Sequence, residues 1–192
     1  MINLKRIPNF LLEIIFGYRI TKFFPERLAI IKAKEHFKNK EIIACEIGVF
    51  KGYHAYQILK HLYIEKLYLI DPYVKYEDYK NDKSYRNILK AKQKAKKLLE
   101  PYKDKIIWIE KFSHDAIKEI NEKIDFLYID GNHFHPYVDN DIKNYYPLVN
   151  KGGIISGHDY SNSWQDVVNA VNKFFNKKRI FFGEGTDWLV FK

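Results

Sequence analysis

The chain has 192 residues, which suits one compact domain with a substantial buried core. A single cysteine, Cys45, excludes a disulfide framework and a multi-cysteine metal site, so we expect a reducing compartment, the cytoplasm. The formal net charge is +9, but residues 1–40 hold nine basic against three acidic side chains and residues 41–192 hold 24 against 21, so the excess charge belongs to the N-terminal segment.

Residues 1–40 are predicted to form a basic, amphipathic, helical extension of a main domain at 41–192. Apolar residues recur there at helical spacing between lysines and arginines, at Phe10, Leu11, Ile14, Ile15 and Tyr18. No stretch is both long and apolar enough to span a bilayer, and the run at 10–16 lacks a cleavage site of small residues. We expect this helix to pack on the main domain or on a second subunit of a homo-oligomer. Peripheral contact of residues 1–25 with the inner membrane surface is the alternative.

From residue 41 onward, short apolar runs alternate with helical patterns. Strands are predicted at 41–49, 66–70, 106–109, 124–129 and 154–156, helices at 53–62, 84–99, 136–148 and 164–175, and two further strands joined by a turn at 179–192. This alternation indicates βαβ units. It therefore predicts an α/β domain with a Rossmann-like, doubly wound, mostly parallel sheet, to which the C-terminal hairpin adds an antiparallel edge.

The residues that follow each strand are the candidates for a site, because ligands of open parallel sheets bind beyond the carboxyl ends of the strands. Gly48 and Gly52 bracket the first strand-to-helix turn, and Asp71 ends the second strand, where it can accept both hydroxyl groups of a ribose. Ordinary turn geometry explains each residue alone, but together they indicate an adenosine-type ligand. The spacing is neither the dinucleotide fingerprint nor a P-loop, which disfavours nicotinamide and triphosphate ligands.

The segments DGNH (130–133) and GHDY (157–160) follow the fourth and fifth predicted strands, and both are rich in acids and histidines. His135 precedes a proline at a helix start and is interpreted as a cap or loop histidine. Asp125 begins a strand and Asp141 lies within a helix, so both are interpreted as structural.

These segments resemble the class I S-adenosylmethionine-dependent methyltransferases, and in particular the small branch that contains macrocin-type sugar O-methyltransferases. The resemblance covers about residues 41–192 and rests on EIGVFKG, LYLIDPY, IDFLYIDGNH and GGIISGHDY. It implies a seven-stranded sheet with Phe112 or Ser113 near the adenine. The implied contacts of the remaining cofactor are Glu46, Gly48, Gly52, Asp71 and Asp130.

In the sugar-methylating relatives, an Asp-x-x-His after the fourth strand supplies a divalent-metal ligand and a general base, which Asp130 and His133 match. An acidic pair after the fifth strand completes the relatives' metal site, whereas this chain has His158 and Asp159. The resemblance thus implies a Mg²⁺ or Mn²⁺ site at Asp130, His158 and Asp159, with His133 and Asp130 as catalytic residues. An imidazole with a pKa of about 6.5 can take a proton at neutral pH.

The leading interpretation is an S-adenosylmethionine-dependent O-methyltransferase that acts on a hydroxyl of a sugar, a glycan or a similar small polyol. The alternatives are an RNA methyltransferase or nucleic-acid-binding protein that uses the basic arm, a metal-dependent hydrolase, and a non-catalytic scaffold. The charge of the arm lies outside the core and no aromatic-basic platform is evident, which argues against a nucleic-acid partner. A hydrolase would leave Gly48, Gly52 and Asp71 without a role.

Overall fold

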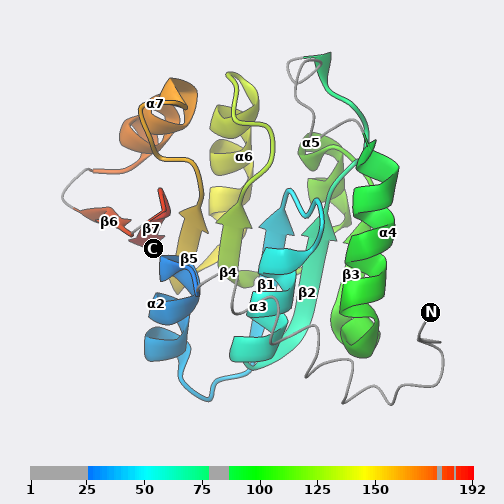
Figure 1. Ribbon diagram of the computed structural model, residues 1–192. Helices are drawn as coiled ribbons and strands as arrows, with labels where there is room; N and C mark the ends of the chain where they lie inside the picture. The colour runs from blue at the N-terminus through cyan, green and yellow to red at the C-terminus, as the bar shows by residue number, and fades with distance from the viewer. Residues whose placement is uncertain (1–25, 78–86, 177–178, 184) are drawn as a thin grey trace.

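A seven-stranded sheet forms the centre of the computed structural model, which describes residues 26–77, 87–176, 179–183 and 185–192. The strand order is β3-β2-β1-β4-β5-β7-β6 (Figure 1). The strands are β1 (Ile42–Ile47), β2 (Ile64–Ile70), β3 (Ile106–Ile109), β4 (Ile124–Ile129), β5 (Val149–Gly157), β6 (Phe181–Phe182) and β7 (Trp188–Phe191). The first five pair in parallel, and β7 pairs antiparallel with β5 and β6. The predicted fold class is therefore confirmed.

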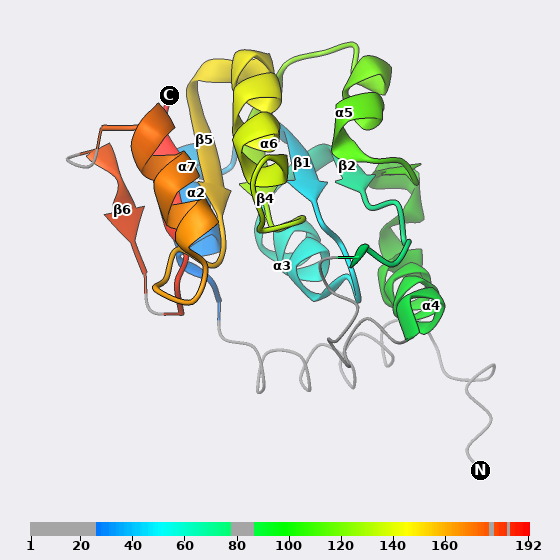
Figure 2. The same cartoon turned by 90° about the horizontal axis from the view of Figure 1, so that it is seen from above.

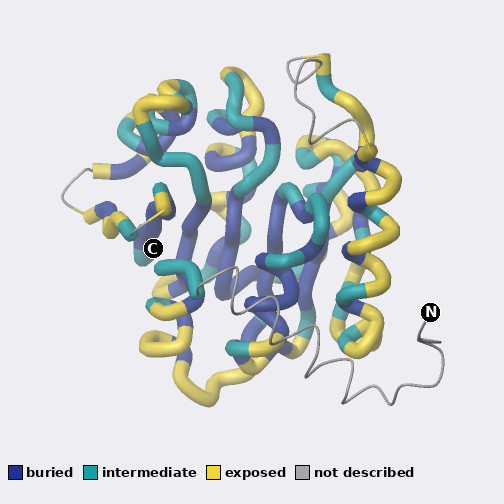
Figure 3. Tube along the Cα trace, viewed as in Figure 1, coloured by how far each residue is buried: buried dark blue, intermediate teal, exposed yellow. Residues whose placement is uncertain are grey.

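Helices cover both faces of the sheet (Figure 2). One layer contains α2 (Leu28–Phe37), α3 (Tyr53–His61) and α4 (Ile88–Leu99), and the other contains α5 (Ser113–Ala116), α6 (Tyr137–Tyr145) and α7 (Gln165–Phe174). Three short 3₁₀ helices, η4 (Glu100–Lys105), η5 (Ile117–Glu119) and η6 (Tyr146–Leu148), follow α4, α5 and α6. Every residue of β4 is buried between the layers (Figure 3), as its sequence, apolar apart from Asp125, predicts.

Two strands are longer than their apolar runs predict, because pairing extends them. Ile42 of β1 pairs with Ile64, so β2 begins before the polar residue Glu65. Ile124 of β4 pairs with Val149, so β5 includes the polar segment ahead of its apolar run. The helix predicted at 84–99 is described from Ile88, and its first turn lies outside the described residues.

Most of the predicted N-terminal extension also lies outside the described residues, including the helix around 10–18 and the segment proposed to touch a membrane. Its last part, α2, packs on α3, β5 and β7, and Ala29, Ile30 and Ala33 are fully buried in the core. The division of the chain at residue 40 stays a prediction. Among the described residues, no helix combines the length and apolar character that crossing a membrane requires.

The strand order reverses at β1, which has β2 on one side and β4 on the other. The chain leaves β1 toward the α3 layer and leaves β4 toward the α6 layer (Figure 2). The loops after these two strands diverge at this point, and a ligand can bind between them.

Candidate functional site

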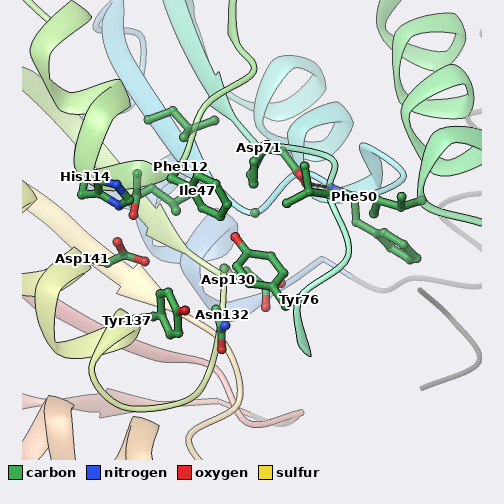
Figure 4. Close-up of a pocket in the computed structure, with 17 residues that line it drawn as sticks. Ile47, Phe50, Asp71, Tyr76, Phe112, His114, Asp130, Asn132, Tyr137 and Asp141 are labelled. Atoms are coloured by element: carbon green, nitrogen blue, oxygen red, sulfur yellow. Dashed lines mark hydrogen bonds between the residues drawn. The ribbon is translucent and has the colours of Figure 1, made fainter. Parts of the chain in front are cut away.

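A cavity lies at the carboxyl ends of β1, β2 and β4 (Figure 4). Ile47, Ile70 and Phe112 contribute apolar surface to its wall. The rings of Phe112 and Tyr137 both stand edge-on to the ring of Tyr76, with centroids 5.8 and 5.9 Å away. The polar lining comes from Asp71, Ser113, His114, Asp130, Asn132 and Asp141. An apolar slot with a few convergent polar groups suits a ligand with a flat aromatic ring.

Asp71 holds the glycine turn that follows β1. Its Oδ2 accepts the backbone N–H groups of Val49 (3.1 Å) and Phe50 (2.8 Å), and its Oδ1 accepts the N–H of Tyr73 (2.8 Å). Burial raises the pKa of this carboxyl group, although the three hydrogen bonds oppose the shift. A carboxylate has about four acceptor positions, so one remains for a ligand. The predicted contact of Asp71 with a ribose stays a prediction. The structure shows in addition that Asp71 fixes the turn after β1.

The two glycines of this turn serve close packing. Gly48 has a φ of 89°, and a Cβ there would overlap the carbonyl oxygen of Asp130. A Cβ on Gly52 would lie 3.1 Å from the Cβ of Ala95 in α4. Gly48 lines the cavity, whereas Gly52 packs against α4. The ligand contact predicted for Gly52 stays a prediction.

Glu46 and His54 form a buried polar pair beneath the same turn. The Nδ1 atom of His54 lies 3.5 Å from Oε1 of Glu46, and the imidazole stacks on the Tyr128 ring at 3.6 Å between centroids. Burial raises the pKa of Glu46 and lowers that of His54, which favours the neutral forms of both. Glu46 Oε2 and His54 Nε2 have no hydrogen-bond partner among the described residues. A polar ligand beside the glycine turn would satisfy such atoms.

Asp130, His133 and Asp159 meet beyond the ends of β4 and β5. The Nε2 atom of His133 lies 3.3 Å from Asp130 Oδ1 and 3.2 Å from Asp159 Oδ2. One ligand atom from each of the three residues lies within 4.8 Å of the other two, a spacing that suits one metal ion. The side chains are 14–21 % exposed, so a small substrate can reach them.

His158 lies beside this cluster. Its Nδ1 is 3.2 Å from Asp159 Oδ1 and 4.0 Å from Asp130 Oδ1, while its Nε2 is 3.3 Å from the hydroxyl of Thr186. Although burial lowers the pKa of His158, the neighbouring carboxylates raise it above its ordinary value. The ligand atoms that lie close enough together for one ion thus come from His133 and the two acids, and His158 contacts the same acids from beside them. The ligand role predicted for His158 stays a prediction.

Arg27, immediately before α2, brings a positive charge to Asp130. Its Nη1 donates to the hydroxyl of Tyr128 (2.6 Å) and to Asp187 Oδ1 (3.3 Å), and lies 3.8 Å from Asp130 Oδ2. Burial raises the pKa of Asp130, but the His133 hydrogen bond and the Arg27 charge outweigh it and hold the pKa below its usual value. Asp130 is therefore kept ionised. Sequence reasoning missed Arg27 and Asp187 because they are distant from Asp130 along the chain.

The remaining candidates divide between the cavity and the surface. Phe112 and Ser113 line the cavity at the position predicted for an adenine. His135 is exposed and its ring pairs with Asp139 at 3.1 Å, as a loop histidine would. Asp125 lies at the opposite end of the sheet, where it accepts the N–H of Ile43.

Asp141 also lines the cavity. The residue pattern indicates a structural role for Asp141 and does not predict this position. It shares the buried face of α6 with Val138, Ile142 and Tyr145. An acid on the apolar stripe of a helix was the available signal.

Residues 45–160 match the model of a family described as a methyltransferase domain. The chain is 31 % identical over 144 residues to an uncharacterized protein, R132, of Acanthamoeba polyphaga mimivirus. The aligned region covers 71 % of this chain and 61 % of R132. The chain thus spans about three fifths of that relative's length.

Solved structures share the fold at low sequence identity. The calicheamicin methyltransferase CalS11 aligns with a TM-score of 0.68 and 12 % identity, covering 97 % of this chain and 87 % of that one. An O-methyltransferase from Bacillus cereus in complex with SAH (S-adenosylhomocysteine) aligns with a TM-score of 0.62 and 14 % identity, covering 98 % and 94 %. Both matches support the Rossmann-like architecture that the strand order shows.

Proposed function

The chain belongs to the methyltransferase-domain family, and we propose that it is an S-adenosylmethionine-dependent methyltransferase whose acceptor is a hydroxyl group of a sugar, a glycan or a similar small polyol. The observation that carries this proposal is the cluster of Asp130, His133 and Asp159. It lies next to the cofactor cavity, because Asp130 belongs to both.

The chemistry of the cluster fits a hydroxyl acceptor. Transfer to a hydroxyl requires alignment of its oxygen with the methyl group and removal of a proton from a weak acid. A divalent cation, Mg²⁺ or Mn²⁺, would supply Lewis-acid chemistry that lowers the pKa of a hydroxyl group. The two carboxylates of the cluster provide the hard oxygen ligands that such an ion prefers. The Trp164 ring, 4.8 Å from the His133 ring, offers an apolar face for a sugar.

His133 can serve the cluster in one of two ways. Its Nε2 lies between two carboxylates, where it either takes the proton of the acceptor or binds the metal ion. One lone pair cannot do both at once, so the two roles predict different behaviour when the imidazole is removed. If His133 is the base, removal of its imidazole lowers the transfer rate and leaves metal affinity unchanged. If His133 is a metal ligand, its removal lowers both the rate and the metal affinity.

The first experiment is calorimetric titration of S-adenosylhomocysteine into the purified protein, once with EDTA and once with Mg²⁺ or Mn²⁺. We expect binding in both conditions and a separate metal isotherm. Labelled methyl transfer is then screened over sugars and small polyols. Absence of cofactor binding in both conditions would refute the assigned cofactor, and transfer to RNA with a steep salt dependence would refute the polyol acceptor.

The matched pair His133→Ala and His135→Ala tests the catalytic role. His133→Ala should lower the transfer rate about 10²- to 10⁴-fold while cofactor affinity stays constant. His135→Ala removes an exposed imidazole two residues away and should leave the rate unchanged. Equal rates for both variants would remove His133 from the mechanism.

A further inference from the structure

Asp141 is a buried acid that α6 directs into the cofactor cavity. Asp141 is only 4 % exposed, and its Oδ2 lies 3.4 Å from the position that a Cβ on Gly131 would occupy. Figure 4 shows Asp141 and Asp71 on opposite sides of the cavity, with Phe112 and Ile47 between them. The carboxyl group therefore faces the end of the cavity that is remote from the glycine turn.

The surroundings of Asp141 do not neutralise its charge with a cation. Burial raises the pKa of the carboxyl group to about 7, and the side-chain hydrogen bond from Ser113 offsets only part of this shift. Among the described residues it forms no ion pair. The titratable neighbours are the thiol of Cys45 on β1 and the phenol of Tyr145 on α6, whose pKa values burial raises, and His114 on α5, which lines the same cavity. An uncompensated buried acid destabilises the fold and in a cleft marks a functional group.

We propose that Asp141 recognises the base of the cofactor, with its carboxyl group hydrogen-bonded to the edge of adenine that carries the exocyclic amino group. This inference rests on the cofactor use stated above. A ribose at Asp71 directs the base across Ile47 and Phe112 toward Ser113 and Asp141. A neutral carboxyl group accepts a hydrogen bond from the amino group through its carbonyl oxygen and donates one to the adjacent ring nitrogen through its hydroxyl. Adenine presents this donor and acceptor side by side.

The test compares S-adenosylhomocysteine with its analogue that carries an unsubstituted purine and so lacks the amino group. Calorimetry with the full chain should show that the wild-type protein prefers S-adenosylhomocysteine about 10- to 100-fold. Asp141→Ala should reduce this preference to about twofold or less. Asp141→Asn should keep most of it, because an amide also offers one acceptor and one donor. Asp139→Ala is the matched control, since it removes an acid of the same helix that pairs with Lys173.

An unchanged preference in Asp141→Ala would overturn the inference, and so would an equal loss of affinity for both ligands, which indicates a structural role. If the alanine variant does not fold, the asparagine variant decides by its pH dependence. Wild-type affinity should fall as the pH rises above about 7, because the protonated carboxyl group is the binding form, and Asp141→Asn should abolish that fall. The same pH profile in both proteins would refute the assignment. A wild-type protein that binds neither ligand would instead refute the cofactor itself.

Discussion

Replacement of Asp71 by asparagine should weaken both the fold and cofactor binding. The carboxylate accepts three backbone N–H groups, two through Oδ2 from Val49 and Phe50 and one through Oδ1 from Tyr73. An asparagine has one acceptor oxygen and one NH₂ group at these positions. Whichever way the amide is turned, its NH₂ group faces at least one N–H donor.

The magnitude follows from that unsatisfied donor. A buried N–H that loses its partner costs about 1–3 kcal/mol. For a domain of this size, each kcal/mol lowers the melting temperature by about 2–4 °C, so Asp71→Asn should melt about 2–12 °C below the wild type. The glycine turn that the carboxylate fixes is part of the cavity wall. Disorder there should lower the affinity for S-adenosylhomocysteine by about tenfold or more.

Asp125→Asn provides the matched control. Asp125 also binds three donors, the N–H of Ile43 and the side chains of Lys40 and Asn150, but at the opposite end of the sheet. Thermal unfolding should show a comparable loss of stability in both variants, whereas calorimetry should show lowered cofactor affinity in Asp71→Asn alone. Equal affinities in the two variants would show that Asp71 does not shape the cofactor turn.

Two further predictions concern the residues around Asp130. Gly48→Ala should lower the free energy of unfolding, measured in urea, by more than about 3 kcal/mol, because Gly48 has a φ of 89° and an added Cβ would overlap the Asp130 carbonyl. Gly152→Ala should lower it by only about 1–2 kcal/mol, because Gly152 has a φ of 77° but open space around the added Cβ. Similar costs for both would contradict the packing role. Arg27→Met removes the charge that helps to lower the pKa of Asp130, so the acidic limb of the pH–rate profile should move to higher pH, and an unmoved limb would exclude the coupling.

The strands of this protein could be predicted because each is a short apolar run between polar segments, and β4 is buried along its whole length. The position of Asp71 followed from the same pattern, since a residue directly after a strand lies at the carboxyl edge of a parallel sheet. Pairing between strands was not predictable from local pattern, and it lengthens β2 and β5.

The charges around Asp130 were less predictable than its position. Arg27 contacts Asp130 and pairs with Asp187, and the three residues lie far apart along the chain, so no local spacing connects them. Asp141 differs, because it stands on the apolar stripe of α6 and a stricter reading of the helical phase would have marked it as buried. The grouping of His133, rather than His158, with the acids depends on side-chain directions that a residue pattern does not contain.

Asp130 connects the cofactor cavity to the proposed acceptor cluster. Its carbonyl packs against Gly48 of the cofactor turn, while its carboxylate meets His133 and Asp159. Changes confined to one side should therefore separate, with Asp71→Asn acting on cofactor affinity and His133→Ala on the rate. Asp130→Asn should weaken metal binding and slow the transfer together, because an amide keeps the size of the side chain but not its charge. If Asp130→Asn lowered cofactor affinity while metal affinity and rate stayed constant, Asp130 would belong to the cofactor site alone and the acceptor cluster would have to be assigned elsewhere.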